Sequence, residues 1–197
     1  MPRKAMSDRQ KQANRSKQKI AKAALSLFQK KGYHNVTIED ICKKADVSVG
    51  GFYHHFSSKG AVFEIVMSEI TGKVSSYVRA HPSGGSARED LRQFLLFFAQ
   101  CHQEIDLGVL QAWLNPSFCA LGDAPDDPSV LEITRLIQAG QSSGEITEQF
   151  SPRELTTHLF VGAKGVIYDW CLHAGGYDLL QRMNLYLSLI HISEPTR

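Results

Sequence analysis

The sequence predicts an all-α protein made of a small N-terminal helix-turn-helix domain and a larger helical domain. Apolar residues recur at helical spacing along most of the chain, and no segment shows strand-like alternation or an internal repeat. Near the N-terminus a tight turn separates two short amphipathic segments. With 197 residues, of which 43% are hydrophobic, the chain is long enough for one compact domain and a smaller one.

The helix-turn-helix lies between Gly32 and Lys59, after a strongly basic helix expected from about Arg15 to Lys31. Thr37 and Ser48 stand where N-caps of the two short helices belong. Residues at helical spacing give each short helix an inward apolar face: Ile38, Ile41, Cys42 and Ala45 before the turn, Phe52 and Phe56 after it. The second helix is left with an outer face of glycines and hydrogen-bonding side chains, which a DNA major groove can admit: Gly50, Gly51, Tyr53 and His54.

Charge is distributed unevenly along the chain. Residues 1–60 contain 13 Lys and Arg against 4 Asp and Glu, a net charge of +9. Residues 61–197 contain 9 and 16, a net charge of −7, so the chain as a whole carries +2. A basic head on an acidic body favours a polyanion bound at one end, and beside a helix-turn-helix that polyanion is double-stranded DNA.

Two Ser-x-x-Glu motifs predict the starts of later helices. Ser86 to Glu89 and Ser151 to Glu154 both have the spacing of a capping box. The helix after Ser151 extends to about His173 and is apolar over much of its circumference, so it must be buried on more than one side. Gly162 and Gly165 give this helix a flat strip that another backbone can approach closely.

The N-terminal quarter of the chain, residues 14–60, resembles the signature of the TetR/AcrR transcriptional regulators. The match runs through many ordered positions: Ile20, Ala23, Ala24, Leu27, Phe28, Gly32, Tyr33, Val36, Thr37, Ile38, Ile41, Ala45, Val47, Ser48, Gly50, Phe52, Tyr53, His55, Phe56, Ser58 and Lys59. The resemblance implies a ligand-responsive repressor that binds a palindromic operator as a homodimer, without a cofactor. A regulator without a small-molecule effector, or an activator, is the alternative.

The resemblance also implies roles for individual residues of the head. Thr37 and Ser48 would offer hydroxyls and helix N-terminal amides to phosphates, and Gly50 would let the backbone come close to the duplex. Tyr53 and His55 look like the family's phosphate contacts. Lys59 would complete this set of contacts to the DNA backbone, as a phosphate clamp. Three positions could reach base edges, namely Val49, Gly51 and His54. The family often has Lys where this chain has Val49 and a polar or small residue at Gly51, so we expect few direct base contacts and more reading of DNA shape. Packing of the small core is the alternative role for Tyr53 and His55.

For the rest of the chain, the resemblance implies a dimer formed by the last two helices and a ligand pocket among the helices between about Ser86 and His173. Gly162 and Gly165 are the candidate dimer contacts. The candidate pocket residues are aromatic for the most part, which favours an apolar or aromatic effector: Phe97, Phe98, Cys101, Trp113, Phe118, Phe160, Tyr168 and Trp170. Each of them could equally serve as a plain core residue.

These expectations divide the chain into four parts. They are a disordered basic arm at 1–14, a helix-turn-helix DNA-binding domain at 15–60, a helical regulatory and dimerisation domain at 61–186, and a non-native tail at 187–197. The tail, LSLIHISEPTR, resembles a translated sequencing adapter. A natural chain cut near Tyr186 would end inside its last helix, so we expect a truncated helix and weaker dimerisation.

Other classes of function find little support in the sequence. Asp169 and His173 lie four residues apart, with His158 on the same helix, but a surface pair at a helix end explains them better than a catalytic dyad or a metal site. The four cysteines show no Cys-x-x-Cys spacing, which indicates a reduced protein without a zinc site. No apolar run reaches the roughly 20 residues of a membrane span, and no export signal is visible. We therefore expect a cytoplasmic, non-enzymatic protein that binds no membrane.

Overall fold

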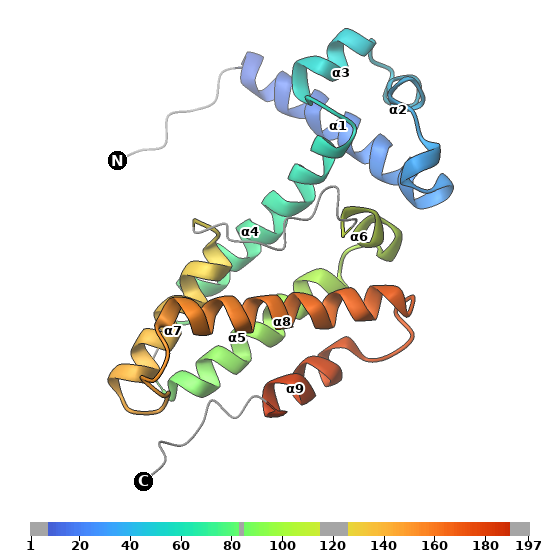
Figure 1. Cartoon of the computed structure of the whole chain (residues 1–197). Helices are drawn as coiled ribbons and strands as arrows, with labels where there is room; N and C mark the ends of the chain where they lie inside the picture. Colours follow the sequence, from blue (N-terminus) through green and yellow to red (C-terminus); the bar gives the residue numbers. More distant parts are fainter. Residues whose placement is uncertain (1–7, 83–84, 115–125, 190–197) are drawn as a thin grey trace. The chain divides into compact units, whose positions relative to one another are not determined.

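The computed structural model describes residues 8–82, 85–114 and 126–189, and all regular structure in these ranges is helical (Figure 1). The prediction of an all-α protein is confirmed. The chain forms two compact units, Met1–Met67 and Ser68–Arg197. Each unit is described separately below.

The first unit contains α1 (Asp8–Lys31), α2 (Ile38–Ala45) and α3 (Val49–His55), with short 3-10 turns at Tyr33–Asn35 and Gly60–Val62. Helix α1 begins at Asp8, so residues 8–14 are helical and the expected disordered arm was wrong for them. These residues include Arg, Lys, Gln and Ala, which are strong helix formers, and an aspartate at a helix N-terminus suits the helix dipole. Residues 1–7 of that arm lie outside the described residues.

An aromatic cluster closes the core of the first unit. The Phe28 ring lies 5.0 Å from Tyr33 and 5.5 Å from Phe63, and Phe52 lies 5.6 Å from Phe56. The predicted apolar face of α2 is buried through Ile41, Cys42 and Ala45. Burial of these rings and aliphatic groups supplies most of the stabilisation that a three-helix domain of this size can obtain.

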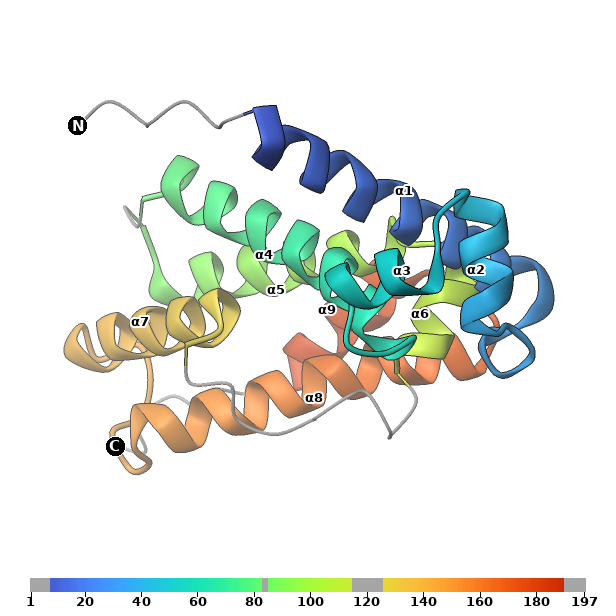
Figure 2. The same ribbon diagram turned by 90° about the horizontal axis from the view of Figure 1, so that it is seen from above.

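The second unit consists of the later part of α4 and five further helices (Figure 2). Their bounds are α4 (Phe63–Ala80), α5 (Ala87–Gln103), α6 (Leu107–Trp113), α7 (Pro128–Ser142), α8 (Pro152–Leu172) and α9 (Leu179–Leu189). Helix α5 contacts α7, α8 and α9, and α8 also contacts α6, α7 and α9. Completely buried side chains come from α5, α6, α7, α8 and α9: Phe94, Leu95, Leu110, Ile133, Ile137, Ile167 and Leu179.

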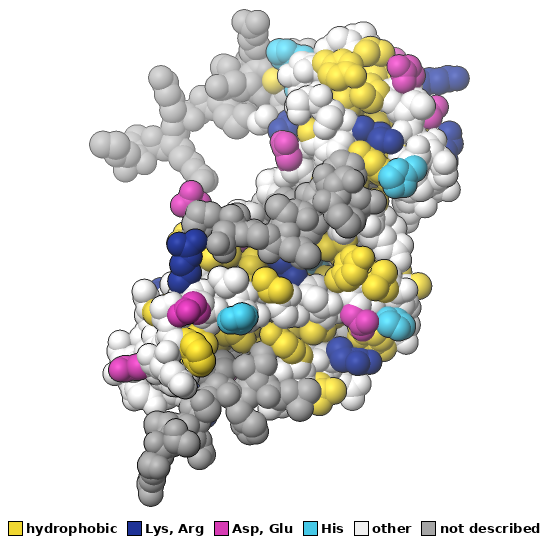
Figure 3. Space-filling view, viewed as in Figure 1, with side chains coloured by type: hydrophobic (Ala, Val, Ile, Leu, Met, Phe, Trp, Pro, Cys, Tyr) yellow, Lys and Arg dark blue, Asp and Glu magenta, His cyan; other side chains and the backbone are white. Residues whose placement is uncertain are grey.

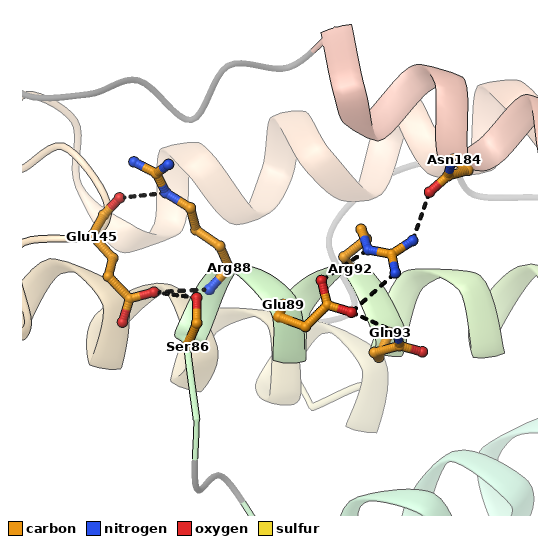
Figure 4. Close-up of polar contacts among 7 residues, drawn as sticks. All are labelled: Ser86, Arg88, Glu89, Arg92, Gln93, Glu145 and Asn184. Carbon is orange, nitrogen blue, oxygen red and sulfur yellow. Dashed lines mark hydrogen bonds and ion pairs between the residues drawn. The ribbon is translucent and has the colours of Figure 1, made fainter.

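The two predicted capping boxes have different outcomes. The one at Ser151 is confirmed, because Ser151 and Glu154 bond each other's backbone N–H groups. The one at Ser86 is wrong, since the Ser86 side chain makes no cap hydrogen bond and Glu89 instead accepts from Arg92 and Gln93 (Figure 4).

Glu145, in the loop between α7 and α8, caps α5 instead. Its carboxylate accepts hydrogen bonds from the Ser86 hydroxyl (2.5 Å) and from the backbone N–H group of Arg88 (3.4 Å) (Figure 4). It also accepts one from the backbone N–H group of Ala87 (3.2 Å). These bonds lower the pKa of Glu145 to about 2. Gly140 of α7 makes room for the Ile146 side chain, because a Cβ at Gly140 would lie 2.5 Å from it, and Gly144 adopts a positive φ of 76° after the helix.

Helix α9 continues through Leu187 to Leu189, the first residues of the expected tail. The rest of that tail, residues 190–197, lies outside the described residues. Arg92 donates a 2.7 Å hydrogen bond to the Asn184 side chain and so joins α5 to α9 (Figure 4).

The cap from Glu145 leads to a first prediction. Glu145→Gln should lower the melting temperature at pH 7, because the amide carries no charge to stabilise the orphan N–H groups of α5. The folded pKa of Glu145 lies below the ordinary value of a glutamate, so its contribution is complete at neutral pH and disappears as the pH falls toward 2. The melting-temperature gap between wild type and Glu145→Gln should therefore narrow in acid. Glu148→Gln, in the same loop, is the matched control, and an equal loss in both variants would contradict the cap.

Candidate nucleic-acid interface

A left-handed residue produces the turn between α2 and α3. Asp46 has φ 53° and ψ 55°, a conformation that Asp tolerates better than most residues. The Cys42 carbonyl accepts the Val47 N–H at 3.1 Å, and the Cys42 thiol lies 3.8 Å from the Ser48 carbonyl. Ser48 then caps α3, as predicted, because its hydroxyl oxygen accepts the Gly51 N–H at 3.0 Å.

Thr37 caps α2 in a full capping box with Asp40. The Thr37 hydroxyl oxygen accepts the Asp40 N–H at 3.1 Å, and the Asp40 carboxylate accepts the Thr37 N–H at 3.2 Å. This second bond is the main reason why the pKa of Asp40 is lowered. The Thr37 amide is therefore engaged within the protein, while the hydroxyl hydrogen can still be donated to an incoming phosphate.

The outer face of α3 is open, as its sequence predicts. Val49 is 41% exposed and Tyr53 is 54% exposed, and His54 is exposed beside them. A Cβ at Gly50 would meet only the Ser48 hydroxyl, at 3.9 Å, so the backbone there can be approached closely. A Cβ at Gly51 would lie 3.3 Å from the same hydroxyl, which is a tighter position.

His55 is half-buried beside the positive charge of α1. Burial is the main cause that lowers the pKa of His55, and the charges of His54 and Lys17 lower it further. The His54 and His55 rings lie 5.0 Å apart. Since Tyr53 is largely exposed, the alternative that it serves the core finds no support in the geometry, whereas His55 both packs and reaches the surface.

The ammonium group of Lys59 bonds protein carbonyls, whereas a phosphate clamp requires it to be available to DNA. Its ammonium donates 2.8 Å hydrogen bonds to the carbonyls of both Tyr33 and Val36, and it lies 4.1 Å from the centre of the Tyr33 ring. Burial lowers its pKa. Two of its three N–H bonds are thus used within the first unit, so the lysine orders the segment before Thr37.

The predicted pocket residues do not form one group. Phe98 and Phe160 lie together, with ring centres 5.5 Å apart, and Trp113 lies near them. Phe97 stacks instead on Tyr77, at 4.2 Å. Of the other candidates, Cys101 is buried, Trp170 donates to the Tyr177 carbonyl, Tyr168 is exposed and Phe118 lies outside the described residues.

The sequence reasoning missed His102, which lies between Phe98 and Trp113. It is 3% exposed, and its ring centre is 4.5 Å from that of Phe98. Its only signal in the sequence was its spacing, four residues after Phe98 on an otherwise apolar stripe of α5.

The two glycines of α8 have different surroundings. A Cβ at Gly162 would lie 1.9 Å from the Tyr186 hydroxyl oxygen, so Gly162 makes room for α9 of the same chain. Gly165 is exposed, and a Cβ there would meet nothing within 4 Å. Only Gly165 is therefore open to a second molecule.

The Asp169 and His173 pair is part of a helix end. Asp169 accepts a 2.6 Å hydrogen bond from the Tyr177 hydroxyl, and His173 bonds the Asp169 carbonyl at 2.9 Å. Within the described residues, no group of three or more His, Cys, Asp or Glu side chains could hold a metal ion. None of the described helices has the length and apolar character that crossing a membrane requires.

Comparison with known proteins is consistent with this geometry. Residues 20–66 match the family described as bacterial regulatory proteins, tetR family. The A-factor receptor protein of Streptomyces griseus is 29% identical over 133 residues, which make up 68% of this chain and 47% of that receptor. The matched stretch thus spans about half the length of this curated relative.

Solved structures share the fold over nearly the whole chain. The fatty acid degradation regulator FadR from Bacillus halodurans superposes with a TM-score of 0.69 at 20% identity, covering 94% of this chain and 96% of that one. FadR from Bacillus subtilis, solved in complex with stearoyl-CoA, gives 0.64 at 20% identity, covering 91% and 99%.

The position of Lys59 leads to a second prediction. Lys59→Met should destabilise the chain by about 1–3 kcal/mol, because two carbonyls lose a charged donor. The fall in the urea midpoint measures this loss. Lys44→Met is the control, since the Lys44 ammonium bonds the Ser26 hydroxyl at an exposed site.

The salt dependence of DNA binding distinguishes this structural role of Lys59 from a direct contact with phosphate. If Lys59 paired with a phosphate, Lys59→Met would reduce the slope of log K against log salt concentration by about one. We expect the slope to stay unchanged.

Proposed function

We propose that this chain, whose residues 20–66 match the bacterial regulatory proteins of the tetR family, is a ligand-responsive transcriptional regulator, acting as a repressor, that binds a palindromic operator as a homodimer. The open outer face of α3 carries the proposal, because it presents side chains to a groove from a helix that Ser48 caps. The proposal involves no catalytic step and no cofactor. A regulator of this kind works beside the chromosome, so we place it in the cytoplasm.

Phosphate contacts would surround the groove. The hydroxyls of Thr37, Ser48 and Tyr53 can each donate to a phosphate oxygen, and His55 adds a ring nitrogen beside Lys17. The excess of Lys and Arg in residues 1–60 supplies the long-range attraction. Lys59 supports this surface indirectly, through its hydrogen bonds to the carbonyls of Tyr33 and Val36.

Sequence would be read by few side chains. His54 is the polar group on the outer face of α3 that can reach a base edge, and Val49 can contact a thymine methyl group. Gly51 contributes no side chain, so DNA shape carries much of the remaining specificity. One short helix reads too few base pairs for selectivity in a genome, and two heads are needed.

An apolar stripe on α8 supports the homodimer. Val161, Gly165, Tyr168 and Leu172 follow one another at helical spacing, and the three with side chains are exposed, Leu172 at 66%. Apolar side chains are visible along α8 in the space-filling view (Figure 3). Leu185 of α9 is exposed as well. We assign this stripe, defined by these four α8 residues, to contact with a second copy of the chain.

The effector would be a small apolar or aromatic molecule. The aromatic residues Phe98, Trp113 and Phe160 come from three different helices and lie near one another. The relative from Streptomyces griseus is named as a receptor, and the structure from Bacillus subtilis is a complex with stearoyl-CoA. Both support a regulator that responds to a small molecule.

Selection of binding sites from a random pool of DNA duplexes tests the proposed function. We expect enrichment of a two-fold palindrome with half-sites about one helical turn apart. Enrichment of no sequence at moderate salt, by protein that sediments as a dimer, would contradict it.

Variants of α3 give a third prediction, measured on the selected operator. His54→Ala should cost about 1–3 kcal/mol of binding and relax the preference at one position of each half-site. Tyr53→Phe should weaken binding to all sequences alike by about 1 kcal/mol, because it removes one hydroxyl donor to a phosphate. Fluorescence anisotropy on the operator and on single-base variants distinguishes the two patterns. Loss of specificity in Tyr53→Phe, or a uniform loss in His54→Ala, would reverse our assignment.

The α8 stripe gives a fourth prediction. Leu172→Asp should shift the chain toward monomer in sedimentation velocity, because it places a charge in an apolar interface. It should weaken binding to a palindrome far more than binding to an isolated half-site. Leu131→Asp on α7 is the matched control, since Leu131 is 54% exposed and lies outside the stripe. A dimer that survives Leu172→Asp but dissociates in Leu131→Asp would place the interface elsewhere.

A further inference from the structure

Three groups that can carry positive charge gather where α1 lies beside the end of α3. Lys17 belongs to α1, and His54 and His55 are the last two residues of α3. The rings of the two histidines lie 5.0 Å apart. The charges of His54 and of Lys17 both act on His55 and oppose its protonation. One edge of the first unit therefore brings together a lysine and two histidines from two different helices.

An aromatic ring of the core holds the Lys17 ammonium in this place. The ammonium lies 5.5 Å from the centre of the Phe56 ring, within the range of a cation–π interaction. Phe56 is 2% exposed and directly follows His55 in the chain. Because the Lys17 side chain is partly buried, its methylene groups lie along the protein while the charge reaches the surface beside His55.

The surroundings of His55 in the free protein disfavour its charged form. Burial is the main cause that lowers its pKa, and the charges of His54 and Lys17 add to it. Among the described residues, no carboxylate offsets these charges at the His55 ring. The other charged groups on the elements next to α3 act on different partners: Glu39 on Cys42, Lys43 on Asp40, Lys44 on Ser26, Asp46 on Lys19, and Lys59 on the carbonyls of Tyr33 and Val36.

An anion would reverse this balance. Like charges held near one another repel, and an anion placed between them replaces repulsion by attraction. A phosphate oxygen is the anion that a DNA duplex brings to the ends of a helix lying in its groove. Beside such an oxygen the protonated ring of His55 becomes the favoured form, because both of its nitrogens are then donors and it carries a positive charge.

We propose that Lys17 and His55 together form one phosphate-binding site at the edge of α3, and that His55 takes up a proton when DNA fills this site. The inference rests on the proposed binding of DNA, and it adds a contact from α1 and a dependence on pH. The proton comes from solvent and binds the ring nitrogen that carries no hydrogen in the neutral form. Lys17 supplies the charge of the site that does not depend on this proton.

The direction of the pH dependence follows from the two states of His55. In the free chain its pKa is lowered, and a phosphate beside the ring raises it in the complex. Between these two pKa values the complex holds more protons than the free chain and duplex together. By linkage, DNA binding must then tighten as the pH falls through this range.

Anisotropy on the full chain tests the proton uptake. The affinity is measured at constant salt from about pH 8 to about pH 5.5, on the selected operator and on an unrelated duplex of equal length. We expect it to rise by up to about tenfold for each head, as one unit of pKa predicts, and on both duplexes, since phosphate contacts do not depend on sequence. An affinity that does not change, or that falls with falling pH, would overturn the proposal.

Histidine variants assign the proton to His55. His55→Gln keeps a hydrogen-bond donor but cannot be protonated, so the pH dependence should be lost. His54→Gln should weaken binding and keep the dependence, and His158→Gln, at an exposed histidine of α8, should behave as wild type. A dependence that persists in His55→Gln would overturn the assignment. Independently of any variant, the pKa of His55 followed by NMR on its ring protons should rise when duplex is added, and an unchanged or lower value would contradict the uptake.

Lys17→Met tests the contribution of α1. The methionine keeps the contact with Phe56 but removes the charge, so the slope of log K against log salt concentration should fall by about one for each head. The pKa of His55 in the free chain should also rise, since one opposing charge is gone. Lys22→Met is the matched control, at an exposed lysine about 140° around the same helix. An unchanged slope in Lys17→Met, or an equal change in both variants, would refute Lys17 as a phosphate contact.

The outcome is separable from that of the proposed function. A chain that selects a palindrome and binds it independently of pH contradicts only the present inference. A chain that binds both duplexes with the expected pH dependence but selects no palindrome contradicts the proposed operator and leaves the phosphate site standing. A chain that binds no duplex contradicts both.

Discussion

The surface that we propose faces DNA is supported by the ammonium group of Lys59, which is not itself part of that surface. Lys59 donates to the carbonyls of Tyr33 and Val36 and lies on the Tyr33 ring, so it holds the connection between α1 and α2. Val36 directly precedes Thr37, the N-cap of α2, and the turn after α2 sets the start of α3. The hydrogen bonds of Lys59 thus order the segment that leads into the helix-turn-helix. Because those bonds are charge-assisted and partly buried, they are stronger than exposed contacts of the same length.

In both units, side chains accept hydrogen bonds from the free backbone N–H groups at helix starts. Some of these caps can be predicted from the sequence and others cannot. Thr37, Ser48 and Ser151 cap helices through residues three positions away, so spacing alone predicts them. The cap of α5 comes from Glu145, which is 59 residues from Ser86. The motif Ser86 to Glu89 has the right letters, but a closer donor pair, Arg92 and Gln93, occupies Glu89. The local pattern fails here for two reasons: Glu89 has competing partners one turn further along its own helix, and tertiary structure brings Glu145 to the helix start.

The same distinction explains which site residues could be found. Helical spacing places Val49, Tyr53 and His54 on the open side of α3, and that prediction follows from the sequence because Phe52 and Phe56 define the buried side. The position of Lys59 could not be predicted, since its carbonyl partners are 23 and 26 residues away. Spacing also puts Gly162 and Gly165 near each other on α8. It does not reveal that the Tyr186 ring covers one of them, because that contact depends on how α9 folds back.

The chemistry of the two units is opposite, and this bears on how an effector could act. In the proposed function the first unit offers donors and positive charge to a polyanion, while the second holds the aromatic rings of Phe98 and Phe160 close together. An effector bound there cannot compete with DNA for the same groups. It can change DNA affinity only by binding one conformation of the chain more tightly than the other, and DNA must then weaken effector binding by the same factor. Couplings of this kind are typically about 1–3 kcal/mol, so a small difference in effector contacts between the two conformations is enough to carry the response.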